Sequence, residues 1–141
     1  MSYLKPLPVL DSETQPFWDG CRQGKLRLQR CTRCGHVRFP PTRFCAKCRS
    51  AEHEWIESSG RGRVFSWIVV RHPVPREVYA ADVPYVVALI TLDEGVRISS
   101  NIVGISPEKV TADMPVRVTF QQATPEITLP LFEPEPQTEG R

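Results

Sequence analysis

Residues 31 to 48 read CTRCGHVRFPPTRFCAKC, and this stretch decides the fold because its four cysteines form two close pairs. Cys31 and Cys34 make the first pair, and Cys45 and Cys48 make the second. Two cysteines separated by two residues can bind one metal ion from a single tight turn, and a second such turn completes a tetrahedral set. The spacing therefore predicts a zinc ribbon with these four cysteines as ligands of a structural Zn²⁺ ion.

A site of four cysteines has no open coordination position, so its metal cannot activate water or polarise a carbonyl group. The zinc is instead expected to stabilise the ribbon, which is too short to bury a core of its own. Four thiolates also bind iron in rubredoxin-type carriers, so an electron carrier is an alternative. The fifth cysteine, Cys21, lies outside the pairs and is expected to be a buried apolar residue.

Charge is distributed unevenly along the 141 residues, although the formal net charge is only +2. Residues 20–51 contain no Asp or Glu, and their nine basic residues are Arg22, Lys25, Arg27, Arg30, Arg33, Arg38, Arg43, Lys47 and Arg49. From Asp93 onward, eight acidic side chains outnumber four basic ones. A basic ribbon beside a more acidic body indicates a polyanionic ligand or an acidic partner surface, although arginines that only solvate a small ribbon would give the same pattern.

Composition also bounds the location of the protein. No stretch approaches the roughly 20 apolar residues that span a bilayer, and no signal segment opens the chain. In a reducing compartment, paired cysteines hold metal more often than they form disulfides. We therefore expect a cytoplasmic protein with no membrane partner.

A short helix is expected before the ribbon, over residues 12–23. Gly24 lies where a C-terminal cap belongs, because glycine adopts the left-handed conformation that ends many helices. Phe17 and Trp18 belong to the apolar stripe of this helix. Together with an extended arm, the helix is predicted to form a first unit, residues 1–24.

The ribbon is predicted to be a second unit, residues 25–52. Gly35 follows its first cysteine pair, where a positive φ would turn backbone N–H groups toward the sulfurs. Arg49 holds the same position after the second pair, where a glycine would adopt that conformation more easily. The second turn is therefore expected to be the less favourable of the two.

The chain after the ribbon has the pattern of a small β-barrel. The expected strands are a short one at 54–58 and longer ones at 64–71, 85–92, 96–103, 116–122 and 127–131. Five or six short strands suit a closed OB-type barrel better than a sandwich, which usually needs more. The fold class is therefore mainly β, with an OB-type barrel over residues 53–132 and a disordered tail, rich in Pro and Glu, over residues 133–141.

No arrangement of catalytic side chains is apparent, since none of the three histidines forms a motif with a carboxylate or a serine. The stretch Gly60-Arg61-Gly62-Arg63 lacks the Lys-Ser/Thr and the following helix of a phosphate-binding loop. We interpret it as a two-glycine hairpin connection, with a phosphate or an acidic partner at Arg61 and Arg63 as the alternative. Trp67 on the next strand is expected to be a barrel-wall residue more often than a stacking platform.

The order of these parts resembles one known family. The motifs that carry the resemblance are Leu26 to Gly35, Phe39 to Pro41, Cys45 to Cys48, Trp55, and Ser59 to Trp67. The combination of the cysteine spacing with Gly-Arg-Gly-x-Val-x-Ser-Trp is much more specific than the cysteines alone. The chain resembles, over roughly residues 17–131, the rubredoxin-like zinc ribbon plus OB-fold proteins called domain of unknown function thirty-five.

Proteins of that family are non-catalytic partners of thiolase-superfamily enzymes (thiolases, acyltransferases or aldolases) and, in some cases, of acyl-CoA hydratases. The resemblance implies that this chain is not an enzyme on its own. It would be an accessory subunit that binds a thiolase-like catalytic partner in a hetero-oligomer and helps to form its acyl-CoA site. The residues implicated are Cys31, Cys34, Cys45 and Cys48 as zinc ligands, Arg61, Arg63 and Trp67 as contacts to CoA or the partner, and Phe17 and Trp18 as docking residues.

A nucleic-acid-binding protein is the main competing hypothesis, because ribbons and OB barrels both occur in such proteins and this ribbon is basic. Single-strand binders usually interleave basic and aromatic residues along the barrel strands. Here residues 85–92 contain no basic side chain, and residues 96–103 contain only Arg97. Nucleic acid is therefore not the expected partner.

Overall fold

The computed structural model describes residue 3 and residues 5–136 of the chain. The ribbon region contains α1 (Gln15–Arg22), β1 (Arg27–Cys31), β2 (Val37–Arg38) and β3 (His53–Glu57). The barrel region contains β4 (Arg61–Val70), α2 (Arg76–Tyr79), the 3₁₀ turns η1 (Ala80–Asp82) and η2 (Pro107–Lys109), β5 (Tyr85–Leu92), β6 (Arg97–Ile102), β7 (Pro115–Gln122) and β8 (Thr128–Pro134). The predicted class, mainly β with a short N-terminal helix, is confirmed.

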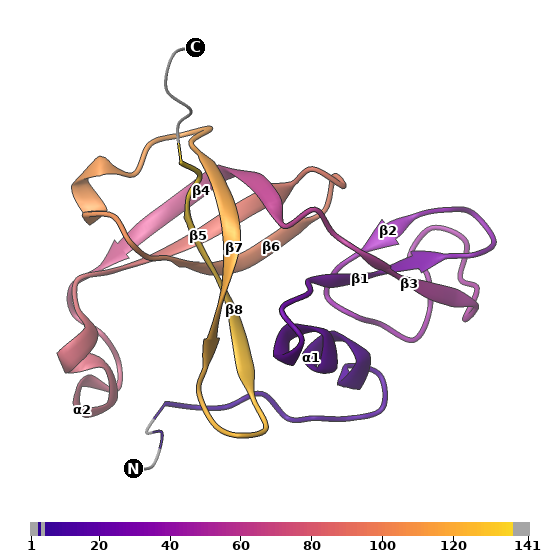
Figure 1. Cartoon of the computed structure of the whole chain (residues 1–141), viewed down its shortest axis with the longest axis horizontal. Helices are drawn as coiled ribbons and strands as arrows, with labels where there is room; N and C mark the ends of the chain where they lie inside the picture. Colours follow the sequence, from indigo (N-terminus) through magenta and orange to yellow (C-terminus); the bar gives the residue numbers. More distant parts are fainter. Residues whose placement is uncertain (1–2, 4, 137–141) are drawn as a thin grey trace.

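The strands form two separate sheets that lie side by side (Figure 1). The first is a three-stranded sheet in the order β2-β1-β3, and the second is a closed barrel in the order β4-β5-β6-β8-β7. Neighbouring barrel strands are antiparallel except β6 and β8, which run parallel where Ile102 faces Phe132. The chain crosses from one sheet to the other between β3 and β4.

Helix α1 is shorter than the predicted 12–23 because Pro16 fixes where it begins. Proline is tolerated in the first turn of a helix but not further inside, so the helix starts at Gln15. Before it, Asp11 Oδ1 accepts hydrogen bonds from the backbone N–H groups of Glu13 (3.0 Å) and Thr14 (2.9 Å). Gly24 then ends the helix with φ of 75°, as predicted.

The ribbon sheet extends further along the chain than the predicted boundary at residue 52. All of β3 pairs with β1, from Arg27 opposite Glu57 to Cys31 opposite His53. Residues 53–57 therefore belong to the sheet of the ribbon, and the barrel begins only at β4. The reason is that β1 is the central strand and needs a partner on both edges.

The interpretation of Gly60 to Arg63 as a hairpin connection is wrong, because β4 already begins at Arg61. Gly62 lies opposite Leu92 of β5 and Val116 of β7, so it is enclosed by a strand on each side. A Cβ atom there would lie 2.6 Å from the Thr91 carbonyl oxygen. Both glycines of the motif thus permit close packing of the barrel, since Gly60 has φ of 77° and no room for a side chain against Val118.

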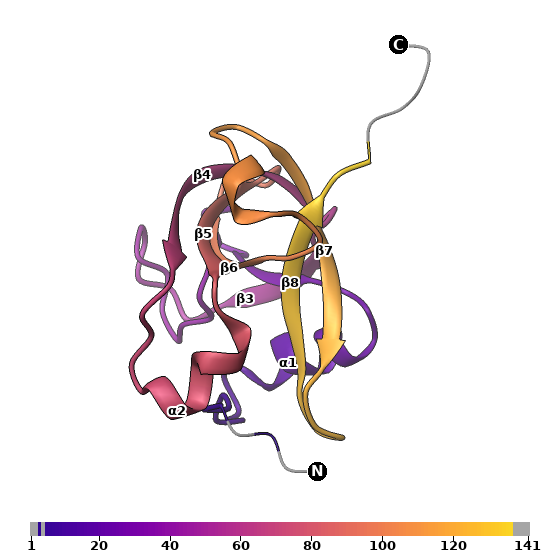
Figure 2. The ribbon, with the colours of Figure 1, turned by 90° about the vertical axis from the view of Figure 1, so that its left-hand side faces the viewer.

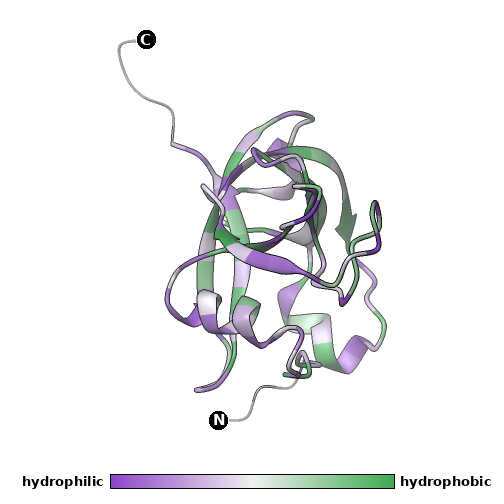
Figure 3. Cartoon of the chain, turned by 90° about the vertical axis from the view of Figure 1, so that its right-hand side faces the viewer, coloured by the Kyte–Doolittle hydropathy of each residue, from purple (hydrophilic) through white to green (hydrophobic). Residues whose placement is uncertain are grey.

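Strand β5 shows how the barrel buries its core. Its residues alternate between half-buried and buried along the whole strand. Figure 3 shows that hydrophobic and hydrophilic segments both occur along the barrel strands. The fully enclosed residues of the barrel are Val64, Val86, Ala88, Ile90, Leu92, Ile98, Ile102, Val116 and Phe132.

The barrel region contains two short elements that the sequence did not predict, and one predicted boundary needs correction. The loop before β5 contains the short helix α2 and the turn η1, which lie next to the N-terminal arm (Figure 2), where Lys5 Nζ is 3.1 Å from Asp82 Oδ2. The predicted tail begins too early, because β8 continues to Pro134 and pairs Glu133 with Arg117. Residues 137–141 of that predicted tail lie outside the described residues.

Among the residues that the structure describes, no helix is both long and apolar enough to cross a lipid bilayer.

Candidate metal centre

The two cysteine turns bring four sulfur atoms to one point at the end of the ribbon. The turns are held by matching backbone hydrogen bonds: Gly35 donates to the Cys31 carbonyl (2.9 Å), and Arg49 donates to the Cys45 carbonyl (2.8 Å). Gly35 has φ of 80° and Arg49 has φ of 67°. The two turns thus share one geometry, and Arg49 adopts it at the steric cost that a side chain imposes on a left-handed conformation.

The sulfurs fit the coordination of zinc. All four Sγ atoms lie within 4.8 Å of one another. Cys31 Sγ is 3.5 Å from Cys48 Sγ, and Cys34 Sγ is 3.6 Å from Cys45 Sγ. A tetrahedral zinc with Zn–S bonds of about 2.3 Å places its sulfurs about 3.8 Å apart. The four cysteines would therefore hold Zn²⁺, which supplies folding free energy to the ribbon.

Backbone N–H groups stabilise the thiolate form of Cys31 and Cys45, the first cysteine of each pair. The N–H of Cys34 points to Cys31 Sγ at 3.5 Å, and this contact holds the pKa of Cys31 below its ordinary value. The N–H groups of Cys48 and Lys47 lower the pKa of Cys45 to about 6. Because metals bind the thiolate, these hydrogen bonds prepare the site for a cation.

Cys21 is separate from this centre. It is 1% exposed on the inner face of α1, and burial raises the pKa of its thiol to about 12. A thiol with so high a pKa carries almost no thiolate at neutral pH. Its position agrees with the prediction of a buried apolar residue.

The predicted docking residues, Phe17 and Trp18, pack inside this chain. Phe17 is 3% exposed, and its ring centroid lies 4.9 Å from that of Trp18 and 5.3 Å from that of Phe39. It therefore joins α1 to the ribbon, and a partner could not touch it in this conformation. Trp18 is half-buried against the same core. The docking role of Trp18 stays a prediction.

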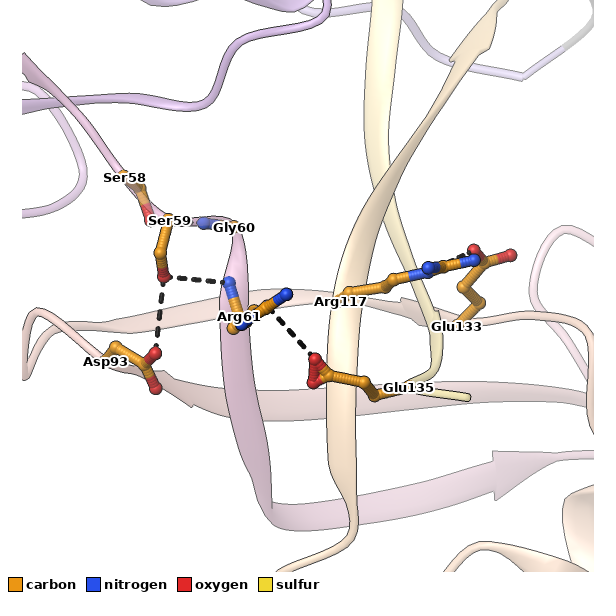
Figure 4. A network of polar contacts seen from close by, with 8 residues as sticks. All are labelled: Ser58, Ser59, Gly60, Arg61, Asp93, Arg117, Glu133 and Glu135. Atoms are coloured by element: carbon orange, nitrogen blue, oxygen red, sulfur yellow. Dashed lines mark hydrogen bonds and ion pairs between the residues drawn. The ribbon is translucent and has the colours of Figure 1, made fainter. Parts of the chain in front are cut away.

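Arg61 and Arg63 project outward from the first half of β4 and are already engaged. Arg61 Nε lies 3.1 Å from Glu135 Oε1, next to the pair of Arg117 and Glu133 on β7 and β8 (Figure 4). Arg63 Nη1 donates to the Asp113 carbonyl at 3.0 Å. Trp67 does not share the outward face of the barrel with Arg61 and Arg63. Its side chain is half-buried and packs against the barrel core. A contact of these three residues with CoA or a partner is untested.

Sequence reasoning missed a buried polar group in the ribbon. Arg38 on β2 is 6% exposed, its Nε donates to Gln29 Oε1 at 2.9 Å, and its Nη2 donates to the Thr42 carbonyl at 3.1 Å. Gln29 is 1% exposed and also accepts from the Thr42 N–H at 2.8 Å. Arginine and glutamine are mostly surface residues. Gln29 follows the apolar Leu28 directly, and its polar side chain gave no sign of burial.

A second arginine was also missed. A β-bulge between Val64 and Ser66 leaves Phe65 pointing outward, half exposed. The Arg97 guanidinium lies 3.7 Å above the centroid of the Phe65 ring, and its Nε donates to Thr91 Oγ1 at 3.3 Å. Bulges are hard to foresee from an alternating pattern, so the sequence did not show that Phe65 and Arg97 would meet.

Two protein-family descriptions match adjacent parts of the chain. Residues 18–54 match the rubredoxin-like zinc ribbon domain of ChsH2, and residues 55–121 match its C-terminal OB-fold domain. Similar proteins carry the name DUF35. The chain belongs to the DUF35 family. This membership confirms the resemblance inferred from the sequence, the OB type of the barrel and zinc as the metal of the four-cysteine site.

Two curated relatives of this DUF35 chain illustrate the family. It is 40% identical over 138 residues to a probable enoyl-CoA hydratase alpha subunit of Thermomonospora curvata, covering 97% of this chain and 42% of that protein. It is 34% identical over 117 residues to a DUF35 domain-containing scaffold protein of Methanothermobacter thermautotrophicus, covering 82% of this chain and 86% of that protein. The chain thus spans about two fifths of the hydratase subunit and most of the scaffold protein.

Among solved structures, this DUF35 chain is similar to a chain of the Ltp2-ChsH2(DUF35) aldolase. The two share 40% sequence identity and a TM-score of 0.81, over 91% of this chain and 98% of that one. The match therefore includes both the ribbon and the barrel.

Proposed function

We propose that this chain is a non-catalytic subunit that binds a thiolase-superfamily enzyme and helps to form its acyl-CoA site. The observation that carries the proposal is the similarity, over nearly the whole of both chains, to the DUF35 component of an aldolase whose name joins it to a second protein, Ltp2. A chain that matches such a component along its full length is expected to act in the same kind of assembly.

The chemistry of the described residues supports the accessory role. The four-cysteine site is closed and leaves no position for water or substrate on the metal. Cys21, the remaining thiol, is buried with a raised pKa. Reactivity toward a thioester would therefore come from the partner, and this chain would supply surface and stability.

The experiment is to produce the zinc-loaded chain alone and together with a thiolase-superfamily protein from the same organism. We expect the pair to co-elute as a hetero-oligomer, with thioester turnover in the complex and none from this chain alone. Turnover by the isolated chain would contradict the proposal, as would failure of every thiolase-like candidate to bind it. A red preparation with iron at the cysteines, or a salt-dependent shift of single-stranded nucleic acid, would point instead to the electron-carrier or nucleic-acid alternative.

A further inference from the structure

A cleft of about 450 Å³ lies where the ribbon meets the barrel. The ribbon contributes His36, Arg38 and Phe39 to its wall, and the barrel contributes Val96 before β6 and Arg97 at its start. Its volume falls within the range of sites that hold small organic ligands. Two arginines from different sheets thus face one cleft.

Both guanidinium groups are fixed in place by the protein and keep unused donors. For Arg38, the Nε and Nη2 bonds to Gln29 and Thr42 hold the plane, and the buried Nη1 has no partner among the described residues. For Arg97, stacking on Phe65 and the bond from Nε to Thr91 hold the plane. No hydrogen bond or ion pair to another described residue occupies its two terminal nitrogens.

The cleft has no opposing negative charge in its described lining. The nearest acidic side chains in sequence, Asp93 and Glu94, lie in the turn between β5 and β6, just before Arg97, but bond elsewhere. Glu94 accepts from Ser58 Oγ (2.7 Å) and the Ser59 N–H (2.8 Å), and Asp93 Oδ2 lies 3.3 Å from Ser59 Oγ. The carboxylates are therefore turned toward the β3–β4 connection, and the positive charge of the cleft is not neutralised.

We infer that this cleft binds the phosphate groups of an organic phosphate, with Arg38 and Arg97 as the anion-binding residues. A buried donor without a partner is unfavourable, and Arg38, whose Nη1 is such a donor, lines this cleft. Guanidinium groups held in a fixed plane lose little freedom when they bind a phosphate, which favours arginine at such sites. The apolar wall at Phe39 and Val96 suits the organic part of the ligand. The identification of the ligand as coenzyme A rests on the proposed function. The binding of phosphate groups in the cleft does not depend on it.

The assignment differs from the one that the sequence suggested. Arg61 is occupied by Glu135, and Arg63 is occupied by the Asp113 carbonyl. Arg97 has free donors in a cleft, whereas these two lie on an outward strand face. The two pairs of arginines therefore make matched test and control positions.

The test measures binding to the zinc-loaded full chain by calorimetry and by amide NMR shifts. The probes are inorganic diphosphate, adenosine 3′,5′-bisphosphate and coenzyme A. We expect saturable binding of all three that weakens with salt, and weakening by about tenfold in Arg97→Gln. Arg61→Gln and Arg63→Gln should stay within about twofold of the unaltered chain. Amide shifts should centre on residues 36–42 and 95–97.

Arg38→Lys is a second variant, since it keeps the charge but loses the planar fork. The zinc content and melting temperature of Arg38→Lys report whether its ribbon still folds. If the ribbon does not fold, the test is decided by Arg97→Gln. Equal binding of diphosphate by Arg97→Gln and the unaltered chain would overturn the inference, as would shifts centred on Arg61. Coenzyme A binding tighter than diphosphate supports a coenzyme A thioester as the natural ligand, and equal affinity contradicts that source. Failure to form a complex with a thiolase-like protein would contradict only the proposed function.

Discussion

The ribbon and the barrel of this chain are stabilised by different means. The barrel encloses its own apolar core, with Ile90, Val116 and Phe132 almost inaccessible to solvent. The ribbon contributes Leu26 and Leu28 to the buried cluster that it shares with the barrel, and its two cysteine turns meet at four thiolates that would hold a metal ion. A small unit that lacks a sufficient core commonly relies on a metal. The comparison teaches that loss of metal and loss of apolar volume should affect different parts of the molecule.

The largest effect is expected from Cys45→Ala, which removes one of the four zinc ligands. Zinc binding contributes about 10–16 kcal/mol in zinc-finger peptides, so a three-ligand site should lose most of its zinc and the ribbon should unfold. Metal content by elemental analysis and the melting temperature measure this. The matched control is Cys21→Ala, which should keep about one zinc per chain. A Cys45→Ala protein with full zinc and an ordered ribbon would contradict the claim that the four-cysteine site stabilises the ribbon.

A large cost is also expected for Phe132→Ala in the barrel. The side chain is 0% exposed, and truncation of a buried phenylalanine costs about 3–5 kcal/mol in free energy of unfolding. Denaturant unfolding measures the cost, with Ile68→Ala, 62% exposed, as the control expected within about 0.5 kcal/mol. Zinc content should not change in the folded protein. Loss of zinc from the folded variant would mean that zinc binding by the ribbon depends on the core of the barrel.

A smaller effect is expected at the two cysteine turns, which share one backbone geometry but differ in residue. Gly35→Ala should destabilise the zinc-bound ribbon by about 1–2 kcal/mol, because a Cβ there meets no atom within 4 Å and only the left-handed backbone resists it. Arg49→Gly should stabilise the ribbon by up to about 1 kcal/mol. Competition with a chelator measures both. Equal effects of the same sign would show that φ does not decide the quality of these turns.

The smallest effect concerns the turn before α1, where Asp11 bonds to Glu13 and Thr14, close to it in sequence. The backbone N–H of Thr14 holds the pKa of Asp11 below its ordinary value. Because the folded pKa is the lower one, this stabilisation is present above about pH 4 and is lost as the pH falls through the folded pKa. The amide shifts of Glu13 and Thr14 should titrate with the Asp11 carboxyl. Asp11→Asn, which keeps an acceptor but no charge, should abolish that titration.

The sequence predicted those features that depend on local spacing. The cysteine pairs identified the zinc ligands, and the strand-like runs at 85–92 and 96–103 identified β5 and β6. The position of Arg49 after Cys48 already indicated the less favourable turn. In each case, residues close in sequence determine the structure directly.

Features that depend on contacts between distant segments could not be predicted. Gly60 and Gly62 have the composition of a turn, yet they are needed because β5 and β7 approach β4 closely. The burial of Arg38 depends on Gln29 from another strand, and the position of Arg97 depends on a bulge at Phe65. Strand β8 continues past the predicted end because β7 offers partners for Glu133 and Pro134. Local composition does not contain this information.

Amide hydrogen exchange of the unaltered chain, with zinc and after chelation, tests most directly whether the metal stabilises the ribbon and an apolar core stabilises the barrel. The account predicts that chelation removes protection from β1, β2 and β3 while β5, β6, β7 and β8 keep most of theirs. Uniform loss of protection over both sheets would contradict it, as would full protection of the ribbon without zinc.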